Sequence, residues 1–274
     1  MTEYLATNSA TDIIAYSVDY LFAAVGAASG AIVVNPDYIG YGQSVDYDRS
    51  FAAPLPYAQS FAMSWLATHK YVANSTAGCS ELENVATVSG YSEGGYAALP
   101  GAFALRQLGV TIWGAYSGGA VYQPIEQYAA ISNTFADGPP TDPIELYLLT
   151  IVIAFTGYSY SNEFPFLANT GADQPLLADF FRMPETPQNV IDWFAVGSTI
   201  GQGYVEFVPE NSTDMFNADF NAIFAAARAD GVTDPCTDYV TSTTDKLCQA
   251  LQEASLIPLL GTFEGGQVLQ VVDL

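Results

Sequence analysis

The pentapeptide Gly90-Tyr91-Ser92-Glu93-Gly94 holds the residues of this chain whose types and spacing best fit catalysis. A short apolar run at residues 85–88 precedes it, as is typical of a buried strand, and a helical pattern follows it. A serine in so sharp a strand-to-helix turn would project its hydroxyl above a sheet, while Gly90 and Gly94 leave room for the strand and the helix to approach. The spacing therefore predicts that Ser92 is a nucleophile.

The residue after the serine would supply a second catalytic group, a backbone N–H. The N–H groups in the first turn of a helix point outward, and the helix dipole favours negative charge there. The backbone N–H of Glu93 is therefore expected to stabilise an oxyanion formed on a substrate carbonyl. The alternative is a turn rich in glycine and serine that carries no chemistry.

The order of helical and apolar patterns predicts the fold class. Helices are expected at residues 12–28, 57–72 and 96–108, and short strands at 31–34, 85–88 and 110–113. Strands that alternate with helices predict an α/β fold with a parallel sheet. We expect a core segment at residues 1–132, a mainly helical cap or lid insertion at 133–235, and an incomplete return towards the core at 236–274, in which 268–272 could form a strand.

The composition restricts the partners. Acidic residues number 29 and basic residues 6, for a net charge of −23, and half of the residues are hydrophobic. Such a surface repels phosphate backbones and anionic membranes, so we expect no nucleic-acid partner. No signal peptide is expected, because the N-terminus has no basic region followed by an apolar run. No transmembrane segment is expected either, because the longest apolar stretch, residues 144–155, is too short to span a bilayer.

The cysteines and the glycosylation motifs bear on whether the protein is secreted into an oxidising compartment. Cys236 and Cys248 flank a polar segment and could form a local disulfide, which would leave Cys79 over; three free thiols are the alternative. Asn-Ser-Thr sequons stand at Asn74 and Asn211 and suggest secretion weakly. We find no spacing typical of metal ligands and no glycine loop for a phosphate, so neither a metal nor a cofactor is expected.

Three segments give the chain a family resemblance. Residues 33–44, 90–98 and 114–119 resemble the secretory lipases of the yeast lipase A type, closely over about 28–124 and more loosely to about 254. The resemblance implies an α/β-hydrolase with a helical cap that cleaves fatty-acid esters and is secreted, acting in lipid catabolism on a neutral lipid or another ester. It also implies that Ser92 is the nucleophile and that Glu93 supplies an oxyanion N–H, although the family more often has an uncharged residue at that position.

The rest of the expected triad is missing from this sequence. In this fold the acid and then the histidine follow the serine, but the one histidine, His69, precedes Ser92. Asp273 could end a strand, but no histidine follows it. Because loss of a triad member costs on the order of 10⁴ to 10⁶ in rate, we expect negligible turnover from this chain alone. The alternatives are a relic of the fold that binds a lipid or a partner without catalysis, and a serine peptidase of the same fold.

Three other groups are weaker candidates. Asp37 and Tyr38 follow an expected strand, where ligands bind in α/β sheets, although a loop tied by its own hydrogen bonds is the simpler interpretation. The acidic run at residues 46–49 lacks the pattern of a calcium loop and is expected to be a solvated turn. Aromatic residues between 155 and 166 could line an acyl channel or form core. These last aromatics are Phe155, Tyr158, Tyr160, Phe164 and Phe166.

Overall fold

The described strands form a three-stranded parallel sheet. The structure is a computed structural model, and it describes residues 23–44, 47, 50–75, 82–136, 218–241, 244–260 and 268–272, together with 149, 152, 156, 159, 160, 163 and 164. The strands are β1 (Val85–Tyr91), β2 (Thr111–Gly118) and β3 (Val268–Val272), in the spatial order β1-β2-β3. β1 pairs with β2 so that Tyr91 lies opposite Gly118. The strands expected at 85–88, 110–113 and 268–272 are thereby confirmed, and the first two run further than the apolar pattern indicates.

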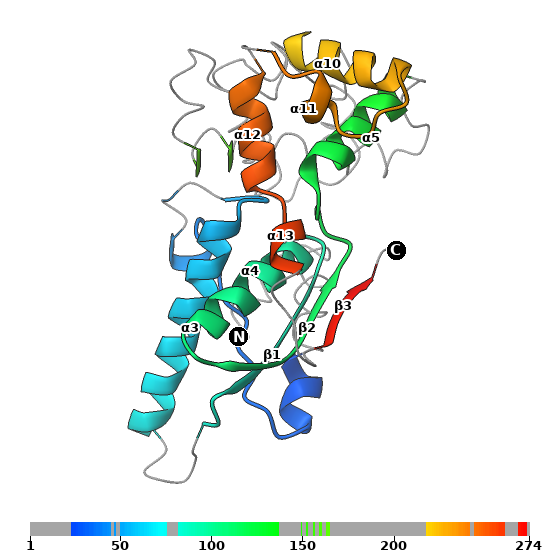
Figure 1. Ribbon diagram of the computed structural model, residues 1–274. Helices are drawn as coiled ribbons and strands as arrows, with labels where there is room; N and C mark the ends of the chain where they lie inside the picture. The colour runs from blue at the N-terminus through cyan, green and yellow to red at the C-terminus, as the bar shows by residue number, and fades with distance from the viewer. Residues whose placement is uncertain are drawn as a thin grey trace, which may run out of the picture.

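Two helices build the layer beside this sheet (Figure 1). Helix α4 (Glu93–Gln107) packs on β1 and β2, and α3 (Pro54–Ser75) packs on α4. Small residues on α4 allow the close approach: a β-carbon on Gly101 would lie within 3.0 Å of the Phe61 ring of α3. Pro54 begins α3, a position where its missing N–H costs nothing. The expected helix at 57–72 is thus confirmed.

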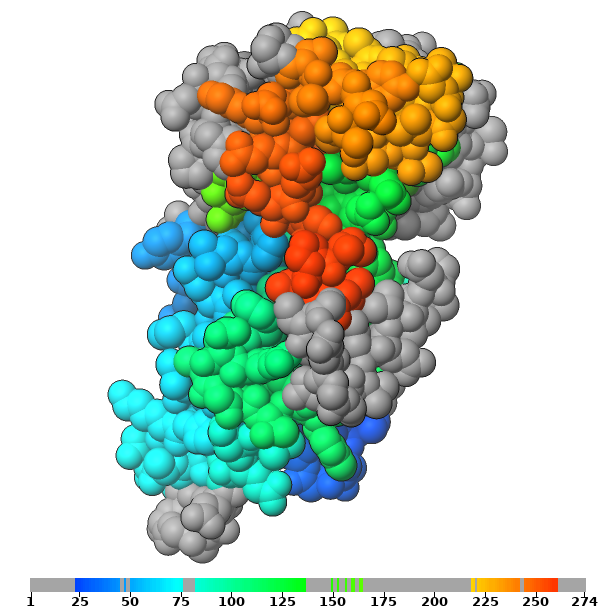
Figure 2. All heavy atoms as spheres, viewed as in Figure 1, coloured from blue at the N-terminus to red at the C-terminus, as the bar shows by residue number. Residues whose placement is uncertain are grey.

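A group of helices lies beyond the sheet, at the top of Figure 1. Helix α5 (Pro124–Ala136) contacts α10 (Ala218–Ala229), α11 (Pro235–Asp238) and α12 (Asp245–Glu253). The short α13 (Ile257–Leu260) contacts α4, and Figure 2 shows α12 and α13 as a continuous strip from these helices down to α4. Buried Tyr96 of α4 donates a hydrogen bond to the carbonyl of Ala254 (2.7 Å) on the same strip. Helix α5 runs across the boundary between residues 132 and 133, where we expected the core segment to end and the cap to start.

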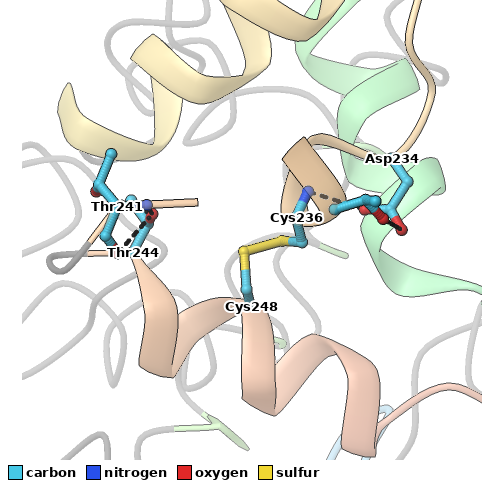
Figure 3. Close-up of a disulfide and its surroundings, with 6 residues drawn as sticks. Asp234, Cys236, Thr241, Thr244 and Cys248 are labelled. Carbon is cyan, nitrogen blue, oxygen red and sulfur yellow. Dashed lines mark hydrogen bonds between the residues drawn. A yellow bond between two sulfur atoms is a disulfide. The ribbon is translucent and has the colours of Figure 1, made fainter. Parts of the chain in front are cut away.

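A disulfide joins α11 to α12 (Figure 3). Both Cys236 and Cys248 are buried, and their Cα atoms lie 5.5 Å apart. Asp234 caps α11, because its carboxylate accepts a hydrogen bond from the backbone N–H of Cys236 (2.8 Å) and Pro235 begins the helix. Of the two alternatives for this pair, the structure has the bridge. Cys79 lies outside the described residues.

The prediction of a strand at residues 31–34 is wrong. This segment has no regular secondary structure, and Ile32 is 52% exposed. An apolar run becomes a strand only when it aligns with a neighbouring ladder, and in the described part of the chain β1 pairs with β2 alone, so its other edge takes no strand from residues 31–34. Residues 23–28 of the preceding helix are helical as expected, and residues 12–22 lie outside the described part.

A short 3-10 helix, η1 (Gly42–Ser44), follows this segment. Across the described residues, no helix combines the length and the apolar character that crossing a bilayer requires.

Candidate active site

Ser92 occupies a strained turn between β1 and α4. Its backbone has φ 57° and ψ −119°, and among the described residues only Ala52 is another non-glycine with positive φ. Such a conformation costs on the order of 1–3 kcal/mol and persists only where the surroundings impose it. The N–H of Ser92 donates to the Gly118 carbonyl of β2 (2.8 Å), and the Ser92 carbonyl accepts from the N–H of Tyr96 (3.1 Å). The side chain is exposed, as attack on a substrate requires.

Glycines make the turn sterically possible. A β-carbon on Gly90 would lie within 3.0 Å of the Gly94 carbonyl, and one on Gly95 within 3.0 Å of the Gly118 carbonyl. Gly94 itself has more room, since the nearest atom to a β-carbon there is the Tyr38 hydroxyl at 3.7 Å. Gly90 and Gly94 were predicted to permit this approach, but Gly95 was not, because its crowding depends on Gly118 of β2.

Helix α4 begins at Glu93, three residues earlier than expected. The backbone N–H of Glu93 therefore belongs to the first helical turn, where N–H groups point out along the helix axis. Glycines at 94 and 95 have low helix propensity, and we expected the helix to start after them. Packing of Gly95 against β2 outweighs that propensity.

The Glu93 side chain is held by two tyrosines that sequence reasoning missed. Its carboxylate accepts hydrogen bonds from the hydroxyls of Tyr57 (2.9 Å) and Tyr41 (3.2 Å). Tyr57 is completely buried, and Tyr38 packs edge-on against its ring with centroids 4.8 Å apart. Burial, and next the charge of Glu93, raises the pKa of the Tyr57 phenol well above its ordinary value, so Tyr57 stays a protonated donor.

His69 is not brought to the serine. It lies on α3, 12 residues beyond Tyr57, which at 1.5 Å per residue is about 18 Å along the helix from the tyrosine that touches Glu93. Its ring packs against Trp65 with centroids 4.7 Å apart. Its Nε2 atom is buried and has no hydrogen-bond partner within the described structure. His69 therefore packs against its own helix and is not the base for Ser92.

The other candidates fall into the roles that sequence analysis gave as alternatives. The Asp37 carboxylate lies against Gly42, whose φ is 55°, and the Tyr38 carbonyl accepts from the N–H of Tyr41 (3.0 Å), so this loop is tied by its own residues. Tyr160 and Phe164 are buried in the core with ring centroids 5.0 Å apart.

Several expected residues fall on positions that the structure does not describe. They are Asp46, Asp48, Arg49, Phe155, Tyr158, Phe166, Asn211 and Asp273. Where the structure does describe side chains, it holds no group of three or more His, Cys, Asp or Glu that could bind a metal ion.

The described residues thus form part of an α/β fold, with a serine at a sharp turn between a parallel strand and a helix. In structure the chain is similar to a proposed hydrolase from Legionella pneumophila, with a TM-score of 0.58 and 16% sequence identity. The match covers 89% of this chain and 56% of the Legionella chain, so this sequence spans little more than half of that protein. No protein-family model matches the sequence, and no curated protein does. The likeness shows the fold.

Proposed function

We propose that the chain carries the nucleophile segment of a serine hydrolase that cleaves carboxylic esters. The observation that carries the proposal is the backbone of Ser92: a non-glycine residue is held at φ 57° between a parallel strand and a helix, with its side chain exposed. That geometry lifts the hydroxyl above the sheet beside the first turn of α4. A surface turn without function would gain nothing from this strain.

The proposed reaction forms an acyl-enzyme. The Ser92 oxygen bonds to the ester carbonyl carbon while its proton passes to a general base, and the Glu93 N–H stabilises the oxyanion. The carbon–oxygen bond to the alcohol then breaks, and the alcohol takes the proton. Water, deprotonated by the same base, attacks the acyl carbon and releases the acid and Ser92.

The base in this proposal is a histidine outside the present sequence. His69 is the one histidine here, and its place on α3 puts it far from Ser92. A histidine with an orienting acid would complete the site. By itself, the 274-residue chain is expected to turn over esters negligibly.

The substrate is proposed to be a neutral ester, with a lipid ester as the finer proposal. A net charge of −23 disfavours anionic substrates, and the resemblance to secretory lipases supports an acyl ester. The disulfide between Cys236 and Cys248 supports secretion, since such bridges persist in oxidising compartments. Asn74 of the first sequon is exposed at the end of α3, which is compatible with glycosylation.

Ester hydrolysis with a base supplied in solution tests the proposal. p-Nitrophenyl esters of short and long acyl chains are assayed with and without imidazole, using the wild-type chain, Ser92→Ala and Ser89→Ala. Ser89 is a matched control, because it is an exposed serine on β1. We expect hydrolysis in imidazole above the rate of the same imidazole-containing buffer without protein in wild type and in Ser89→Ala, but not in Ser92→Ala. Equal rates in wild type and Ser92→Ala would refute the proposal.

Binding without catalysis is the second candidate, and the remote position of His69 favours it. It requires that a fluorescent fatty acyl ligand binds to the chain, and that neither imidazole nor a longer polypeptide yields Ser92-dependent turnover. A peptidase of the same fold would instead cleave peptide p-nitroanilides in a Ser92-dependent reaction, in addition to activated esters. Ester hydrolysis, anilide hydrolysis and ligand binding, measured on the same variants, therefore separate the three functions.

A further inference from the structure

Two tyrosine hydroxyls donate hydrogen bonds to the side chain of Glu93, the residue that follows the proposed nucleophile. We infer that Tyr41 and Tyr57, which we call the tyrosine clasp, fix the Ser92–Glu93 turn through the Glu93 carboxylate and so position the oxyanion donor. The inference rests on the proposed function and deepens it. Neither tyrosine touches the reacting atoms in this account, so both are positioning residues.

The contacts put Tyr57 at the centre of the clasp. Its hydroxyl lies 2.9 Å from a Glu93 carboxylate oxygen and 2.9 Å from the backbone carbonyl of Ser50. A phenol has a single proton, so these two acceptors share it. Since Tyr57 is buried, water does not replace either bond. Movement of the Ser50 segment is therefore transmitted to Glu93.

The Ser50 segment is held from the other side by residues expected to belong to the cap. The N–H of Phe51 donates to the Ser159 hydroxyl (2.7 Å), and the Tyr160 hydroxyl donates to the carbonyl of Ala52 (3.0 Å). The Ser50 hydroxyl also donates to the Glu163 carboxylate. Ala52 itself has φ 51°, a conformation that residues other than glycine rarely adopt. A hydrogen-bonded path thus runs from residues 159–163 through Ser50 and Tyr57 to Glu93.

This path matters because oxyanion stabilisation depends on accurate placement. A donor acts at 2.7–3.1 Å from the developing charge, and loss of a single donor costs about 10² to 10³ in rate. The clasp holds the side chain of the residue that carries the donor, directly beside the strained Ser92. The cap that would contact the acyl chain is consequently linked to the donor that would contact the carbonyl.

The first test needs no reaction. Amide hydrogen exchange is measured at Ser92 and Tyr96, whose N–H groups close the turn. Tyr57→Phe and Glu93→Ala are each expected to accelerate this exchange about tenfold, as loss of a buried hydrogen bond implies. Glu93→Gln, which keeps a carbonyl oxygen for Tyr57, should stay within about threefold of wild type. Tyr128→Phe is the matched control, because it removes a buried phenol hydrogen bond, that with the Thr156 hydroxyl, from α5 without touching Glu93 or the turn.

The second test measures reactivity of Ser92 with a fluorophosphonate in the same variants. Tyr57→Phe and Glu93→Ala are expected to lower the maximal labelling rate about tenfold, as a displaced donor implies, and to leave the half-saturating probe concentration unchanged. Glu93→Gln should retain the wild-type rate, and Tyr128→Phe should leave it unchanged. An equal change in the Tyr128→Phe control, or a parallel change in both constants, would overturn the inference.

The two tests separate this inference from the proposed function. If no variant is labelled but exchange responds as expected, the hydrolase proposal fails and the clasp stands as the device that fixes the turn. If Ser92 is labelled and neither exchange nor rate responds to Tyr57→Phe and Glu93→Ala, the clasp is wrong and the hydrolase proposal stands.

Discussion

Gly95 packs so closely against Gly118 that a β-carbon on Gly95 would lie within 3.0 Å of the Gly118 carbonyl oxygen. Backbone therefore meets backbone where α4 crosses β2, three residues after Ser92, whose own N–H donates to the same carbonyl (2.8 Å). Because no side chain can rotate away to relieve the crowding, this contact fixes the distance between strand and helix. The turn at Ser92 follows from it.

Substitution of neighbouring glycines should give opposite results. Gly95→Ala is expected to destabilise the fold by about 1–3 kcal/mol, because overpacking has to move backbone. Gly94→Ala should be neutral or stabilising by up to about 1 kcal/mol, since its β-carbon meets nothing closer than 3.7 Å and alanine favours a helix. Urea denaturation of both variants checks this, and equal losses would contradict the close contact.

Backbone strain at Ser92 should be measurable as a difference in the free energy of unfolding between two variants. Glycine adopts φ 57° without steric cost, so Ser92→Gly is expected to be about 1 kcal/mol more stable than Ser92→Ala. Both variants lack the hydroxyl, so their difference isolates the β-carbon. At Ser89 on β1, glycine should instead be less stable than alanine by a similar amount. Thermal denaturation gives both differences, and the same sign at the two positions would argue against a strained turn.

Alkaline pH should destabilise the fold through its buried tyrosines. Burial is the largest cause that raises the pKa of Tyr57, Tyr96 and Tyr160 well above the ordinary value. Their contribution is complete below about pH 10, where both states are protonated, and is lost as pH rises, because the unfolded chain ionises first.

The expected slope above pH 10 is about 1.4 kcal/mol per pH unit for each such tyrosine. Urea titrations between pH 8 and 11, on the order of the range where tyrosine ionises, measure it. Tyr57→Phe should reduce the slope by about 1.4 kcal/mol per pH unit, which is the contribution of one tyrosine. An unchanged slope in that variant would mean that Tyr57 ionises freely in the fold.

The disulfide should stabilise the helices around it. Cys236 and Cys248 are separated by 12 positions, and closing a loop of that size contributes roughly 3 kcal/mol in the chain-entropy description. The double variant Cys236→Ala/Cys248→Ala is expected to lose about that much, and dithiothreitol should lower the melting temperature of wild type but not of the variant. An identical response of both proteins to the reductant would show that the bridge does not form.

Local patterns sufficed for the part of the fold that holds the proposed nucleophile. The apolar run at 85–88, the glycines and the following helix are adjacent in sequence, so the strand, the turn and α4 could all be predicted. The strand at 268–272 was also predictable from its apolar residues. The apolar run at 31–34 also predicted a strand, and this prediction was wrong, because strand formation depends on a distant partner that a local pattern does not contain.

The surroundings of the serine could not be predicted for the same reason. Tyr57 and Glu93 are 36 residues apart, and Gly95 and Gly118 meet only because α4 lies on β2. No periodic signal connects such pairs. Burial of Tyr57 in turn requires Tyr38 from a third segment. Tertiary packing therefore decided which glycine is essential and which side chains hold Glu93.

The most direct measurement of the central claim is intact-mass spectrometry after reaction with a fluorophosphonate, followed by peptide mapping. We expect a single adduct on the wild-type chain in the presence of imidazole, located at Ser92, retained in Ser89→Ala and absent from Ser92→Ala. An adduct that maps to another serine, or labelling that survives in Ser92→Ala, would contradict the assignment of Ser92 as the nucleophile.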